Sequence, residues 1–170
     1  KIPINGSIEL LPLCNMNCDM CYVRLSRTEM EAQGRLRTLD EWLDMAEEMR
    51  KAGALFLLLT GGEPLLYPGF KQLYLKLKEM GFIITINTNG TLIDEGWASF
   101  FGEHKPRRIN ITLYGADDRA YRDLCHYPGG FEKVMEAVNL LKEQGVDVKL
   151  SSSLTRANQH DIEQIIALGE

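Results

Sequence analysis

Five short apolar runs alternate with stretches of helical periodicity, and this alternation constrains the fold more than any other feature of the sequence. The runs lie at about residues 7–13, 54–59, 82–87, 108–113 and 146–151. Apolar residues recur at helical spacing in about residues 38–53, 69–80, 94–101, 131–144 and from 158 onward. Strands that alternate with helices are typical of βαβ units, so the sequence predicts an α/β fold with parallel strands. The polar stretch 23–37 is expected to be a long loop.

The last three strands each have one apolar and one polar face. In residues 108–113, for example, Ile109 and Ile111 alternate with Asn110 and Thr112. In a curled parallel sheet the apolar faces meet the outer helices, so the polar faces are expected to line the interior. The interior of an ordinary eight-stranded barrel is packed with apolar side chains instead. A polar interior therefore indicates a cavity for a polar ligand.

Composition excludes several classes of protein. The 170 residues are enough for one domain, expected to span residues 1–170, and 45% hydrophobic with 25% charged content is ordinary for a globular chain. No apolar run approaches ~18 residues, so no membrane partner is expected. The net charge of −5 argues against a nucleic-acid partner. Three clustered cysteines do not form a disulfide framework, which favours a reducing, cytoplasmic location.

The clustered cysteines are Cys14, Cys18 and Cys21, which follow the first strand with C-x3-C-x2-C spacing. Cysteine-only sets with short spacings indicate zinc or an iron–sulfur cluster. A structural zinc site needs four ligands, and a cubane cluster needs one ligand per iron. Three cysteines therefore leave one coordination position open for chemistry. The alternative is a zinc site completed by a histidine or by Cys125, which is otherwise expected to be an inert buried thiol.

A second motif, Thr60 followed by Gly61-Gly62-Glu63-Pro64, comes directly after the second strand. Glycines allow close backbone approach to a ligand, and the adjacent carboxylate suits an ammonium group. The alternative is a plain turn in which Glu63 faces solvent. Further polar segments follow the other strands, at residues 87–90, 112–115 and 151–156. Ligands bind at this edge of α/β sheets, so we expect one site there.

The cysteine spacing, followed by an aromatic residue and later by Gly-Gly-Glu-Pro, resembles the radical S-adenosylmethionine (SAM) enzymes. The resemblance implies that Cys14, Cys18 and Cys21 hold a [4Fe-4S] cluster whose fourth iron binds SAM. Reduction then yields a 5′-deoxyadenosyl radical that abstracts hydrogen from a substrate. The resemblance also implies a set of SAM contacts: Tyr22, Thr60, Gly61, Gly62, Glu63, Asn87, Asn89 and Thr112. It identifies no catalytic residue, because Tyr114 stands where many relatives carry an acidic residue.

The family fold is a partial (βα)6 barrel of the TIM type, whereas only about five βα units are visible here. The chain is therefore expected to be a fragment of a longer protein. Segments such as residues 111–116 look most like enzymes with a C-terminal SPASM or twitch extension, many of which modify peptides or protein side chains. The resemblance further implies a flavodoxin- or ferredoxin-type electron donor. A zinc-stabilised binding module and a simple iron–sulfur electron carrier remain the rival functions.

Overall fold

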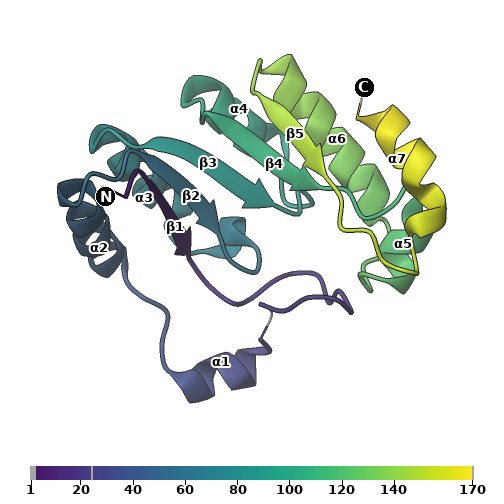
Figure 1. The fold of residues 1–170 in the computed structure, drawn as a ribbon, viewed down its shortest axis with the longest axis horizontal. Helices are drawn as coiled ribbons and strands as arrows, with labels where there is room; N and C mark the ends of the chain where they lie inside the picture. The colour runs from purple at the N-terminus through teal and green to yellow at the C-terminus, as the bar shows by residue number, and fades with distance from the viewer. Residues whose placement is uncertain (1–2, 24, 170) are drawn as a thin grey trace. The chain divides into compact units, whose positions relative to one another are not determined.

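The computed structural model describes residues 3–23 and 25–169, which form two compact units (Figure 1). Of these residues, 3–14, 23 and 25–87 form the first unit, and 15–22 and 88–169 form the second. Both ends of the expected 1–170 domain lie outside the described residues. No helix among the described residues is long and apolar enough to cross a membrane.

The first unit is built on three parallel strands, β1 (Asn5–Glu9), β2 (Phe56–Thr60) and β3 (Ile83–Thr88). β2 lies between the other two, with Asn5 opposite Phe56 and Phe56 opposite Ile83. Its helices are α1 (Arg27–Gln33), α2 (Leu39–Lys51), the 3-10 helix η1 (Pro64–Leu66) and α3 (Phe70–Glu79). α2 packs against α3, whereas α1 lies apart from them (Figure 1).

Capping explains where two of these helices begin. In α2 the hydroxyl of Thr38 accepts from the amide of Glu41, and the Glu41 carboxylate accepts from the amide of Thr38. Ser26 and Glu29 form the same reciprocal pair at the start of α1. The expectation of a loop over residues 23–37 is therefore wrong. α1 is only seven residues long and buries none of them, so it has no apolar period to reveal it.

The second unit contains the parallel pair β4 (Arg108–Thr112) and β5 (Val148–Ser151), with Ile109 opposite Val148. Its helices are α4 (Glu95–Glu103), α5 (Asp118–Asp123), α6 (Gly130–Glu143), η2 (Gln159–Asp161) and α7 (Ile162–Leu168). α6 packs against both α4 and α5. The short α5 was not expected from the sequence.

The predicted α/β fold with parallel strands is confirmed. In β4 the side chains of Ile109 and Ile111 are fully buried, while those of Asn110 and Thr112 are half-buried, so the apolar face forms the core as expected. The expected first strand, 7–13, is wrong in its bounds because β1 ends at Glu9. Pro12 has no N–H to donate to a sheet, and only single backbone hydrogen bonds continue the pairing from Leu10 to Leu13.

Candidate functional site

In the first unit, the segment that leads to Cys14 runs beside the loop that follows β2. The amide of Leu10 donates to the carbonyl of Thr60 at 2.9 Å. The amide of Gly62 then donates to Leu11 O at 2.7 Å, and that of Glu63 donates to Leu13 O at 2.8 Å. These bonds continue the pairing of β1 and β2 beyond the strands themselves. The first cysteine and the Gly-Gly-Glu motif are therefore held at the same edge of the sheet.

Gly61 and Gly62 are required by this backbone pairing. A Cβ on Gly61 would lie 2.5 Å from Leu11 O, and one on Gly62 would lie 2.2 Å from Leu13 O. Gly61 also has φ of +145°, a conformation that side-chain-bearing residues resist. The close approach that the sequence predicted for these glycines is thus made to the chain's own backbone, directly before Cys14.

The side chain of Glu63 is fully buried, so the alternative of a plain turn with Glu63 in solvent is wrong. Its Oε1 accepts a hydrogen bond from the amide of Leu65 at 3.1 Å, which caps η1. Burial of a carboxylate is costly unless charge or hydrogen bonds compensate it. This buried carboxyl group belongs to the residue whose amide pairs with Leu13 O, directly before Cys14.

A cavity of about 480 Å³ opens beside Cys14 in the first unit. Its walls are mainly apolar and come from the segment before Cys14, from α1 and from the region around η1: Leu11, Leu13, Leu25, Met30, Leu36, Leu66 and Pro68. Ser26 and Arg27 are its polar residues apart from the thiol. Apolar surroundings limit solvent access to a metal centre and so tune its potential. This wall was missed from the sequence because residues 23–37 were expected to be a loop.

In the second unit, residues 15–22, which we call the cysteine loop, are fastened by a closed ring of three hydrogen bonds. Asn15 Nδ2 donates to Thr91 Oγ1 at 2.8 Å, and Thr91 Oγ1 donates to Asn89 Oδ1 at 2.7 Å. Asn89 Nδ2 closes the ring by donating to Asn15 Oδ1 at 2.9 Å. The side-chain amide of Asn89, predicted to contact SAM, is therefore engaged by the cysteine loop.

The opposite side of the cysteine loop is attached to residues 124–126. The amide of Asn17 donates to Cys125 O and the amide of Asp19 donates to Leu124 O, both at 3.0 Å. Nε2 of His126 lies 2.6 Å from Asp19 Oδ1. These contacts join segments more than 100 residues apart, so no local pattern could have revealed them.

The Cys18 thiol contacts the fully buried Cys125 within this attachment. The hydrogen bond with Cys125 is the largest cause that lowers the pKa of Cys18 to about 7. Burial raises the pKa, whereas a hydrogen bond with Tyr114 lowers it further. Thiolates are the form that binds metal, so the lowered pKa would favour ligation by Cys18 near neutral pH.

The remaining predicted residues lie at the ends of strands or on the cysteine loop. Asn87 and Thr112 are half-buried near the ends of β3 and β4, and Tyr22 is 93% exposed. Cys14, Cys18 and Cys21 form no disulfide, and Cys21 is exposed. In residues 3–23 and 25–169, no three His, Cys, Asp or Glu side chains are gathered as in a finished metal site. Such sites commonly assemble only when the metal draws its ligands together.

Comparison with known proteins finds several to which this chain is similar. The AdoMet-dependent heme synthase of Methanosarcina barkeri is 25% identical over 162 residues, which cover 95% of this chain and 46% of that protein. SuiB of Streptococcus suis, solved with precursor peptide SuiA, superposes with a TM-score of 0.83 over 98% of this chain and 36% of its own, at 18% identity. The structure of anSMEcpe with bound AdoMet and the Kp18Cys peptide gives 0.79 at 21% identity, covering 98% of this chain and 48% of that one.

The chain thus spans about half the length of the curated relatives it matches. The two superpositions confirm the expected partial barrel fold. The family model of the radical SAM superfamily, whose members bind a [4Fe-4S] cluster and SAM, matches residues 8–169. This chain therefore belongs to the radical SAM superfamily.

Proposed function

We propose that this chain is the catalytic core of a radical SAM enzyme that acts on a peptide or protein side chain. Cys14, Cys18 and Cys21 would hold the cluster. The bound cluster and SAM supply the 5′-deoxyadenosyl radical, which abstracts a hydrogen atom from the substrate. The single observation that carries the proposal is the pairing of Leu11–Leu13 with Gly62 and Glu63, because it fastens the first cysteine beside a buried carboxylate.

The chain's own residues have distinct tasks in this proposal. The thiol of Cys18, with its lowered pKa, binds iron as a thiolate without strongly alkaline conditions. Glu63, with Thr60, Gly61 and Gly62, would bind the methionine end of SAM through a charge and backbone carbonyl groups. The apolar cavity beside Cys14 would keep water away from the cluster.

Other predicted contacts would hold the rest of the cofactor. Asn87 would form a hydrogen bond with SAM from the end of β3, and Thr112 would form one with the ribose. The exposed Tyr22 would lie beside the adenine and contact it through its backbone. Asn89 is a weaker candidate for a side-chain contact, because its Oδ1 already accepts hydrogen bonds from both the amide and the hydroxyl of Thr91.

The structural relatives support a peptide substrate. SuiB was solved with its precursor peptide and anSMEcpe with peptides, and both share the fold of this chain. A flavodoxin- or ferredoxin-type protein would supply the electron in the cytoplasm. The specific alternative to a peptide substrate is a heme precursor, because the heme synthase aligns with 95% of this chain.

Anaerobic reconstitution of the full-length protein tests the reaction. We expect about four irons per chain, a reduced-cluster EPR signal that changes when SAM is added, and release of 5′-deoxyadenosine with dithionite. Cys18→Ala should lose the cluster, whereas the matched variant Cys125→Ala should keep it. One bound zinc without visible absorption would establish the binding module instead. A reducible cluster that ignores SAM would establish the electron carrier.

The substrate class is tested separately by the rate of 5′-deoxyadenosine release. A synthetic peptide library should raise this rate above that of the substrate-free enzyme, and the modified peptides should show altered masses. Stimulation by a porphyrin but not by peptides would replace the peptide assignment with the heme-precursor alternative. Neither outcome affects the assignment of the cluster and SAM.

A further inference from the structure

We propose that Asn15, Asn89 and Thr91 are positioning residues whose hydrogen-bonded ring sets the conformation of the cysteine loop before iron binds. This inference rests on the proposed function only in that the cysteine loop carries cluster ligands. Asn15 directly follows Cys14 and precedes Cys18 by three positions. Fixing its side chain therefore limits the directions in which the loop can present its thiols.

The ring uses both ends of the Asn15 amide. Asn15 donates through Nδ2 and accepts through Oδ1, so the side chain is held at two points. An aspartate would lack the donor, and a glutamine would place its amide one methylene farther out. Two-point attachment fixes orientation as well as position. This is the property that a loop bearing several metal ligands requires.

The ring is attached to a rigid turn at the end of β3. The amide of Thr91 donates to Asn89 Oδ1 at 2.9 Å, and the amide of Gly90 donates to Thr88 Oγ1 at 3.1 Å. Asn89 and Thr91 are 6% and 8% exposed. A Cβ on Gly90 would lie 2.9 Å from Ile111 Cγ2, so this turn packs directly on the core side chain of β4. The turn is therefore buried and packed against the core of the second unit.

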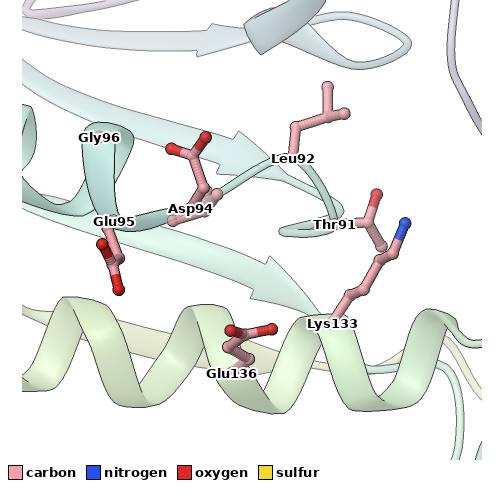
Figure 2. A pocket seen from close by; sticks show the side chains of 8 residues that line it. Thr91, Leu92, Asp94, Glu95, Gly96, Lys133 and Glu136 are labelled. Carbon is pink, nitrogen blue, oxygen red and sulfur yellow. The ribbon is translucent and has the colours of Figure 1, made fainter.

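A second polar pair supports the ring from outside. The hydroxyl of Tyr127 contacts Asn15 and Thr91 and accepts a hydrogen bond from Lys133 Nζ at 3.0 Å. Thr91 and Lys133 both line an open cavity of about 630 Å³ between the start of α4 and α6, where Lys133 extends toward Thr91 (Figure 2). The cation lowers the pKa of Tyr127. The ring is thus connected to α6 as well as to the turn at residues 88–91.

The geometry assigns a role to Asn89 that differs from the predicted cofactor contact. Its Oδ1 accepts from the amide and the hydroxyl of Thr91, while its Nδ2 donates to Asn15. The Asn-Thr-Asn-Gly segment indicated only a turn or a ligand contact in the sequence. Its partner Asn15 is 74 positions away, and the folded chain alone reveals the pairing.

Two substitutions of Thr91 in the full-length protein test the ring. Thr91→Val removes the hydroxyl that both accepts from Asn15 and donates to Asn89, at nearly unchanged volume. Thr91→Ser keeps that hydroxyl and is the matched control. The first readout is hydrogen exchange of the amides in residues 15–22 in the iron-free protein. Loss of two hydrogen bonds should speed this exchange about tenfold in Thr91→Val, and Thr91→Ser should exchange like wild type.

The second readout is the rate at which a ferrous chelator removes iron from the reconstituted protein. We expect about tenfold faster loss in Thr91→Val than in wild type or Thr91→Ser. Rates of hydrogen exchange and iron removal in Thr91→Val that equal those of wild type would overturn the inference. Equal increases of these rates in Thr91→Val and Thr91→Ser would also overturn it. If Thr91→Val does not fold, Asn15→Asp replaces the Nδ2 donor with a charged acceptor oxygen, and wild-type behaviour of that variant also overturns the inference.

Failure of the proposed function gives a different result. Wild-type protein that takes up no iron refutes the cluster assignment, whereas the exchange experiment still reports on the ring. Normal iron uptake together with unchanged exchange in Thr91→Val refutes the ring alone.

Discussion

The backbone amide of Asn17 donates a 3.0 Å hydrogen bond to the carbonyl oxygen of Cys125, 108 positions later in the chain. Together with the bond from Asp19 to Leu124, it forms a two-rung ladder along the cysteine loop. Cys18 lies between the two rungs and contacts Cys125. Cys125, which the sequence indicated to be an inert buried thiol, therefore lowers the pKa of the predicted cluster ligand Cys18.

The first prediction concerns the reactivity of Cys18 in iron-free protein. Its pKa is lowered from 9.0 to about 7, chiefly by Cys125, so thiolate should persist well below pH 9. Alkylation of Cys18 by iodoacetamide, followed by peptide mass spectrometry across pH 5–10, should show a midpoint near 7. In Cys125→Ala the midpoint should move toward 9.0. An unchanged midpoint in that variant would mean that Cys125 does not stabilise the thiolate.

The same shift has a consequence for stability. A group whose pKa is depressed by folding stabilises the folded state above its unfolded pKa and loses that contribution as pH falls through the folded value. The free energy of unfolding of iron-free protein should therefore rise between pH 7 and 9, as measured by urea titration. The rise should be smaller in Cys125→Ala.

The second prediction concerns Gly62. Its Cβ position lies 2.2 Å from Leu13 O, so Gly62→Ala must push the loop away from the segment before Cys14. We expect a loss of about 2 to 3 kcal/mol in the free energy of unfolding, together with reduced iron uptake. Gly96→Ala in α4 is the control, since its nearest neighbour is a side-chain oxygen 3.3 Å away. That variant should change stability by less than about 1 kcal/mol and leave iron uptake intact.

Local signals account for the parts of the fold that the sequence predicted well. The helix α2 combines a capping box at Thr38 and Glu41 with a buried stripe that includes Trp42 and Ala46. The helix α1 has an equally good capping box but buries no residue. Hydrophobic periodicity reports burial, so it reveals α2 and misses α1.

The candidate site was predictable only in its composition. Cys14, Cys18, Cys21 and the Gly-Gly-Glu motif were recognisable from spacing and position after strands. The contact of Cys18 with Cys125 and the ring that includes Asn15 and Asn89 depend on pairings across more than 70 residues. Such pairings follow from the folded topology, since side-chain hydrogen bonds leave no periodic trace in a single sequence.

The third prediction concerns Asn158, whose side chain is fully buried. Its Nδ2 donates to Tyr114 O at 2.8 Å and to Ser153 O at 3.0 Å, while Oδ1 accepts from the amide of Thr155 at 2.6 Å. It thereby joins the segments that follow β4 and β5. Asn158→Ala leaves these backbone groups without their side-chain partner and should cost about 3 kcal/mol in urea unfolding. Asn139→Ala on the exposed face of α6 should change stability by less than about 0.5 kcal/mol; equal effects would contradict this role.

The last prediction separates the charge of Glu63 from its structural bond. Glu63→Gln keeps an oxygen that can accept from the amide of Leu65, so the cap of η1 and the cluster should both survive. It removes the buried negative charge proposed to face the ammonium group of SAM. We expect iron content to be unchanged while the Kd for SAM, measured by anaerobic equilibrium dialysis, rises about tenfold, the result of losing a charge-assisted hydrogen bond. Glu79→Gln, at the exposed end of α3, should leave both quantities unchanged. If Glu63→Gln binds SAM like wild type, the ammonium group is held by backbone carbonyls alone, and the buried carboxylate serves only to cap η1.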